Sequence, residues 1–185
     1  MSVNAELARI FGSDLDAIHL APIGTTLPTT IDGALDAAFD DVGWLSDDGL
    51  TESLTGSVEK KRGHQGNGVV RTRISEPGTT VTFQALESKA QTNGLRYHEK
   101  TATSADGVRH STRGPGQRIT ARAAVIDVFD ADETTVKERY VIPRLEISPN
   151  GDRVLNNKDI SAYPFIGEII GDYDHFATDL EDVTP

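Results

Sequence analysis

The sequence has 185 residues, a formal net charge of −11, and 37% hydrophobic against 25% charged residues. This length can bury a sizeable core and predicts a single domain over residues 1–185, but aromatic residues, at 6%, are too few for an aromatic-rich core. The negative charge argues against general nucleic-acid binding, which needs Lys and Arg to replace phosphate counterions, and the absence of cysteine excludes disulfides and thiolate metal sites.

No targeting or membrane segment is expected. The N-terminal sequence MSVNAELARIF has no basic region followed by an apolar run, so it does not predict a signal peptide. No apolar run approaches the length of a membrane span. We therefore expect a soluble protein made without an export signal, and the lack of cysteine fits folding in a reducing cytoplasm.

The first sixteen residues permit two interpretations. Asn4 can act as an N-cap for a short helix over residues 4–11, with Leu7, Ile10 and Phe11 on one face. An N-terminal arm over residues 1–16, ordered only against a partner, fits equally well.

Residues 17–53 alternate between extended and turn patterns, and they hold the only tryptophan, Trp44. Asp32 can cap a brief helix, and Asp and Gly in the sequence SDDG tolerate positive φ in a turn. Four elements are predicted: a strand at 17–23, a helix at 33–39, an extended segment at 42–45 and a turn at 46–49.

From Leu50 onward the pattern is mainly that of β-strands. Residues 50–61 predict a polar strand that is exposed or covered by a partner, followed by a mobile glycine-rich loop at 63–68. Residues 69–75 and 79–86 predict a hairpin, because the Glu-Pro-Gly sequence at 76–78 suits a type II turn. Apolar and polar residues alternate after it, as in a half-buried strand.

The remaining residues predict one helix, three strands and an acidic tail. The phase of the apolar residues changes close to Pro143, which predicts a bulge or bend there. Asn150-Gly151 predicts a hairpin turn. The elements are a helix at 87–98, an irregular stretch at 101–117, strands at 119–129, 134–148 and within 159–173, and a frayed, flexible acidic tail at 175–185.

The residues that could carry chemistry do not form a recognisable site. The five histidines, at 19, 64, 98, 110 and 175, include no pair at helical ligand spacing, and no H-E-x-x-H occurs. The loop at 63–68 lacks the Gly-Lys-Ser/Thr ending of a phosphate loop, and no G-x-S-x-G elbow is present.

The acidic clusters are better explained as solvated charge than as metal ligands. Asp127, Asp130, Asp132 and Glu133 lack the glycine and the twelfth-position glutamate of a calcium loop. The C-terminal acids read as a solvated tail; they are Asp172, Asp174, Asp179, Glu181 and Asp182. We therefore expect no catalytic, cofactor-binding or metal-binding residues and no cofactor.

One run of sequence resembles a known family. Pro22, Gly24, Thr25, Leu27, Pro28 and Thr29 are followed by LDAAF at 35–39, by Gly43-Trp44 and by DGLTES at 48–53. This order resembles the N-terminal region of major tail, or tail tube, proteins of long non-contractile-tailed phages, particularly phages of actinobacteria. The later TVTFQALES, VIP and YPF segments also match in order, so that the resemblance covers roughly residues 17–170.

The resemblance implies a mainly β fold, a β-sandwich or partial barrel with one flanking helix and long loops. It also implies a non-enzymatic structural virion protein, assembled in the host cytoplasm, whose hexameric rings stack into the tail tube. The implied partners are further copies of the chain, a tape-measure protein, tail terminator and baseplate or tail-tip proteins, and tail assembly chaperones. Viral DNA is expected to pass through the lumen without specific binding, because a negative lumen repels phosphate; no membrane is involved.

Two other interpretations stay open at this stage. A non-enzymatic β-sandwich binding or decoration module of a virion would behave as a monomer with aromatic residues gathered on one exposed face. A hydrolase with a concealed carboxylate site would need a pocket containing acidic groups with strongly shifted pKa values.

Overall fold

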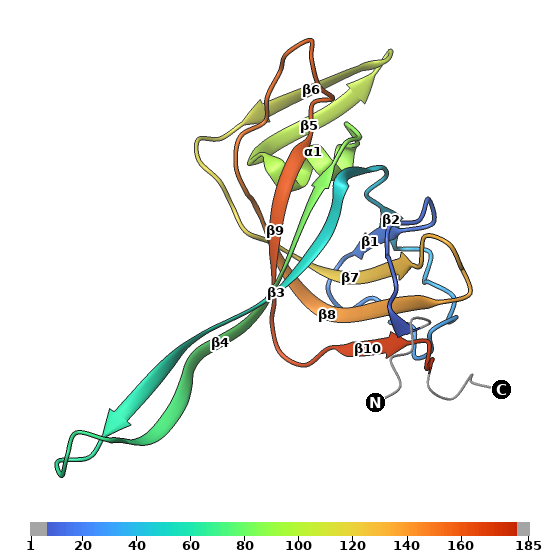
Figure 1. Ribbon diagram of the computed structural model, residues 1–185. Coiled ribbons are helices and arrows are strands. Elements are labelled where there is room, and N and C mark those ends of the chain that lie inside the picture. The colour runs from blue at the N-terminus through green and yellow to red at the C-terminus, as the bar shows by residue number, and fades with distance from the viewer. Residues whose placement is uncertain (1–6, 181–185) are drawn as a thin grey trace.

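The computed structural model describes residues 7–180, which form ten strands and one helix (Figure 1). The helix is α1 (Ala90–Arg96). The strands are β1 (Ala17–Ala21), β2 (Asp40–Asp41), β3 (Leu45–Arg62), β4 (Val69–Ala85), β5 (Glu99–Ala105), β6 (Val108–Arg113), β7 (Thr120–Phe129), β8 (Lys137–Pro149), β9 (Tyr163–Ile169) and β10 (Asp174–Ala177). The predicted mainly β fold with one flanking helix is confirmed. No helix within residues 7–180 is long and apolar enough to cross a membrane.

Eight strands join in one antiparallel sheet. Its order is β2-β1-β7-β8-β9-β4-β3, with β10 paired to β8, while β5 and β6 form a separate two-stranded sheet. Strand β8 changes its partner along one edge, since residues 138–141 pair with β10 and residues 145–149 pair with β9. The sheet can therefore turn at β8 and enclose a core.

The change of partner coincides with a bulge in β8. Arg122 and Ala124 of β7 lie opposite Leu145 and Ile142, so three steps along β8 correspond to two along β7. The extra length falls at Pro143 and Arg144, and a proline is tolerated there because a bulge leaves a residue outside the ladder. The bulge predicted near Pro143 is confirmed.

The core is one cluster of buried residues contributed mainly by β1, β4, β7, β8, β9 and α1. Val81, Phe83 and Ala85 of β4 are buried, which confirms the predicted alternation of that strand. The rings of Phe83 and Phe165 meet with centroids 5.4 Å apart. Helix α1 is shorter than the segment predicted at 87–98, but it lies within it and buries Leu95.

Strands β3 and β4 continue beyond the sheet as a long two-stranded ribbon, here called the arm and defined as residues 54–78 (Figure 1). The hairpin predicted around residues 76–78 is wrong, because β4 runs through this sequence without turning. Thr55 pairs with Gly78 and Ser57 with Ser75, so Glu76 and Pro77 occupy a bulge, where Glu76 has a φ of 54°. The reversal lies at the glycine-rich residues 63–68.

The segment before β3 also differs from the prediction. The helix expected at 33–39 is a loop, because the side chain of Asp36 accepts the N–H of Ala38 at 2.9 Å and its carbonyl accepts the N–H of Phe39 at 3.0 Å. These local bonds stabilise a turn in place of helical ones. Of the extended segment at 42–45, only Leu45 belongs to a strand.

The turn predicted at 46–49 is a bulge within β3. Leu45 pairs with Ala85 and Leu50 with Phe83, so five steps on β3 correspond to two on β4. Gly49, with a φ of 62°, lies in this irregular section. The Asp-Gly sequence correctly predicts a residue with positive φ. The chain nevertheless continues in the same direction, because β3 pairs with β4 on both sides of the bulge.

Two connections in the C-terminal half were misassigned. The stretch expected to be irregular at 101–117 contains most of the β5–β6 hairpin, which begins at Glu99 and whose turn is Asp106-Gly107 with φ values of 52° and 75°. Asp-Gly is a strong signal for such a two-residue turn. The hairpin turn predicted at Asn150-Gly151 is instead the start of a connection over residues 150–162, although β8 and β9 do pair antiparallel.

Both ends of the described chain are paired to the sheet. Residues 8–11 are not helical; Ala131 donates to the carbonyl of Ile10 at 2.8 Å, and Phe11 forms a bridge with Asp130. Residues 4–6 of the expected helix lie outside the described residues. Within the tail predicted as frayed, residues up to 177 belong to β10, which pairs with β8, whereas residues 181–185 also lie outside the described part.

Candidate assembly surfaces

The calcium-loop candidates are engaged with their own chain. Arg139 donates to both oxygens of Asp127, at 2.5 and 2.9 Å. Asp130 accepts the N–H groups of Asp132 and Glu133, each at 2.9 Å, and these bonds lower the pKa of its carboxyl despite its burial. Among residues 7–180, no group of three or more His, Cys, Asp or Glu side chains has an arrangement that could hold a metal ion.

The predicted histidines lie on separate elements. His19 is in β1, His64 at the turn of the arm, His110 in β6, and His175 in β10. His98 lies beside the β5–β6 hairpin, where its carbonyl accepts the N–H of Gly114 at 2.7 Å. Only His175 contributes to a cluster of polar side chains, which lies at the base of the arm.

The base of the arm is tied to the body by tyrosines and carboxylates. Glu52 of β3 accepts from the hydroxyls of Tyr140 at 3.4 Å and Tyr173 at 3.2 Å. Glu138 accepts from Tyr140 at 3.3 Å and contacts His175 Nε2 at 3.2 Å. The rings of Tyr140 and Tyr173 stack with centroids 6.4 Å apart. This cluster connects β3, β8 and the residues at the start of β10 at the base of the arm.

The cluster predicts a loss of stability in alkali. Burial, together with the charges of Glu52 and Glu138, raises the pKa of Tyr140 above its ordinary value of 10.0. Above about pH 10 the unfolded chain loses this proton while the folded chain keeps it, so the free energy of unfolding falls, by up to about 1.4 kcal/mol per pH unit. Urea unfolding between pH 9 and pH 11 measures this, with Tyr140→Phe as the control that is expected to show a shallower decline. Parallel declines for both chains would contradict the prediction.

The arm exposes apolar side chains on one face, with Lys60 among them, and mainly charged side chains on the other. Val58 and Ile74 are cross-strand partners and each is 62% exposed. On the opposite face Glu59 lies across from Arg73, and Lys61 across from Arg71. Two-stranded ribbons bury too little surface to be stable alone, and exposed apolar patches mark interaction sites. The arm therefore has the character of a contact element.

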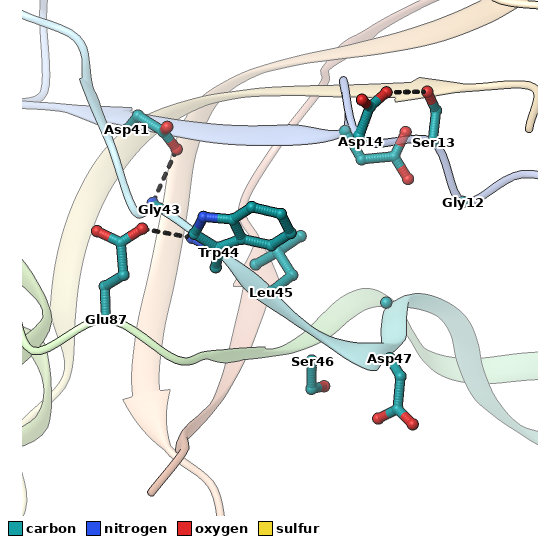
Figure 2. A pocket seen from close by; sticks show the side chains of 12 residues that line it. Gly12, Ser13, Asp14, Asp41, Gly43, Trp44, Leu45, Ser46, Asp47 and Glu87 are labelled. Carbon is teal, nitrogen blue, oxygen red and sulfur yellow. Dashed lines mark hydrogen bonds between the residues drawn. The ribbon is translucent and has the colours of Figure 1, made fainter. Parts of the chain in front are cut away.

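A second feature is a hollow of about 380 Å³ beside the start of β3, shown in Figure 2. Trp44 lies on it with 70% of its surface exposed. The hollow is lined by five carboxylates and by no lysine or arginine; the carboxylates are those of Asp14, Asp16, Asp41, Asp47 and Glu87.

Local hydrogen bonds build the wall of this hollow. Asp41 accepts the N–H of Gly43 at 2.9 Å, and Glu87 accepts the N–H of Trp44 at 3.0 Å (Figure 2). The second bond lowers the pKa of Glu87, and nearby Lys89 adds to the effect. Burial raises the pKa of Asp16, although the N–H of Phe129 donates to it. Gly43 has a φ of 88° and leaves room for the Glu87 carboxylate, which would lie 2.4 Å from an added Cβ.

These features support binding between proteins rather than catalysis. The hollow contains carboxylates and an indole, and the hydroxyl of Ser13 donates to the carboxylate of its neighbour Asp14 at 3.3 Å, an exposed local contact with no histidine or lysine among the described residues that line the hollow. The sequence leaves open whether residues 50–68 lie at subunit contacts or form an ordinary exposed hairpin, and most of these residues belong to the arm. Neither the length of the ribbon nor the presence of the hollow is among the features predicted from the sequence. For the ribbon, a signal is present in the sequence: the polar segments on the two sides of the glycine-rich turn have matching lengths.

A family model described as phage tail tube protein matches residues 4–173, which is most of the chain. A comparison with curated proteins gives no match.

Proposed function

Because the chain belongs to the phage tail tube protein family, and is therefore a structural component of the virion tail that assembles from many subunits, we propose that it forms hexameric rings that stack into the tube. In this proposal residues 1–185 form one tail tube domain, and viral DNA passes through the lumen without specific binding. The family is a structural one, and we propose no catalytic, metal or cofactor role for any residue.

The observation that carries this proposal is the arm. It projects from the sheet (Figure 1), and its apolar side chains have no cover within the described chain. When an element of one subunit contacts a different surface on the next subunit, the contact is heterologous. Repeated contacts of this kind generate rings or filaments. The formal net charge of −11 supports a lumen that repels phosphate.

The proposed partners follow from the same function. Within the tail, further copies of the chain would surround a tape-measure protein, with terminator and baseplate or tail-tip proteins at the two ends. Tail assembly chaperones would act in the host cytoplasm before assembly. These partners are proposals that rest on the family.

Electron microscopy of the purified protein tests the proposal. We expect annular particles at low concentration and tubes at high concentration, visible in negative stain. Sedimentation velocity on the same samples should show a fast species that grows with concentration. A chain that stays monomeric at every concentration would instead support a virion binding or decoration module.

A further inference from the structure

The arm needs a protein surface to cover it. Val58, Val70 and Ile74 expose 62%, 75% and 62% of their surface, and all three project from the ribbon beyond the edge of the sheet. From Leu54 to the turn the ribbon is about 30 Å long, at roughly 3.3 Å per residue. It therefore extends far enough to contact a neighbouring molecule.

The arm is also basic, in contrast to the chain that carries it. It contains five cationic side chains, Lys60, Lys61, Arg62, Arg71 and Arg73, and two carboxylates, Glu59 and Glu76, whereas the whole chain has a formal net charge of −11. Lys61 pairs with Glu59 at 3.1 Å. Arg71 and Arg73 have no side-chain partner within the described residues. Arms therefore repel one another and are attracted to the acidic body of another copy.

The hollow around Trp44 has the complementary chemistry. Carboxylates bind a guanidinium through paired charged hydrogen bonds, and the face of an indole attracts a cation. Asp14 and Asp47 are exposed at its rim and neither forms an ion pair with a cation in the described structure. Arginine suits such a site better than lysine, because its planar group stacks on an aromatic ring and binds carboxylates with two nitrogens at once.

We propose that the arm of one copy docks on the hollow of a second copy, with Arg71 and Arg73 directed to the carboxylates and to Trp44. This inference rests on the proposed function, since it assumes self-association, and it identifies which two surfaces meet. Arg71 and Arg73 lie on the face of the arm opposite Val58 and Ile74, so this docking uses the charged face and leaves the apolar face for a further protein contact in the assembly.

Charge reversal on each surface, alone and combined, tests the pairing. Arg71→Glu with Arg73→Glu alters the arm, and Asp14→Lys with Asp47→Lys alters the hollow. All four positions are exposed, so the variants should fold, which circular dichroism checks. Each double variant is expected to weaken association by about tenfold or more in sedimentation velocity, and the chain with all four changes should recover most of the loss. Asp152→Lys with Lys158→Glu, at exposed positions on another loop, is the matched control.

The outcomes separate this inference from the proposed function. Tubes that tolerate the hollow reversal would overturn the docking and leave the function intact. Association that depends on both surfaces but yields no rings or tubes would support the docking and contradict the function, and a strictly monomeric wild type would contradict both. Loss of binding to a DNA duplex on arm reversal, with unchanged assembly, would show a nucleic-acid contact and overturn the docking.

Discussion

Replacing Arg139 with methionine is expected to lower the free energy of unfolding by about 3–5 kcal/mol, because it leaves a buried carboxylate without its partner. Both side chains of the Arg139–Asp127 pair are at least nine-tenths buried, with exposures of 9% and 8%. Arg139 also donates to the carbonyls of Gly33 at 2.7 Å and Thr30 at 3.5 Å, so its loss releases the loop between β1 and β2 from the sheet. Urea unfolding followed by circular dichroism measures the change.

Two further variants identify the cause. Arg144→Met removes an exposed pair with Glu146, in which half of the arginine surface is accessible, and it should cost about 0–1 kcal/mol. Arg139→Met combined with Asp127→Leu should recover part of the stability, because no isolated charge remains although the loop carbonyls still lose their donor. Equal stabilities for Arg139→Met and Arg144→Met would show that the buried pair does not hold the loop.

Excising the arm is expected to abolish assembly while leaving the fold intact. Residues 56–77 can be replaced by Asn-Gly, a pair suited to a two-residue hairpin turn between Thr55 and Gly78. None of the removed residues is buried, so the free energy of unfolding should change by less than about 1 kcal/mol. Sedimentation velocity should then show a monomer at concentrations where the intact chain forms rings or tubes.

A second variant separates the length of the arm from its apolar side chains. The triple variant Val58→Thr, Val70→Thr and Ile74→Thr keeps β-branched residues in a ribbon of full length. Each valine change replaces a methyl group by a hydroxyl, and the isoleucine change also shortens the side chain. We expect weakened assembly from this chain and none from the excised one. Tubes of normal appearance from the excised chain would show that the arm is not the contact on which assembly depends.

The elements that could be predicted are those in which a local pattern and the final packing agree. Strand β4 near Phe83 and strand β9 near Phe165 alternate regularly because one face of each enters the core. The bulge at Pro143 was predictable because the phase of the apolar residues changes there and a proline cannot continue a ladder.

The failures occur where partners distant in sequence decide the local structure. The sequence around Pro77 favours a turn, but β3 pairs with β4 on both sides of it and converts the extra residue into a bulge. The phrase LDAAF suits a helix, but Arg139, which lies far along the chain, holds the preceding carbonyls in a loop. Neither partner can be identified from spacing alone. The hollow is lined by Asp14, Trp44 and Glu87, which come from three separated segments of the chain. No single sequence motif therefore predicts it.

The pairing of the strands also implies an order of folding. Arg62 pairs with Val69 across a short turn, so the arm can form from a continuous piece of chain, and hairpins of this kind form within about 1–10 μs. By contrast, β1 pairs with β7, where Leu20 meets Ala124, and the body cannot close until residues far along the chain have been synthesised. Folding dominated by such non-local contacts is slow. During synthesis, therefore, both strands of the arm and their exposed apolar side chains emerge well before the sheet that carries them can close, and the arm is stabilised only when that sheet forms.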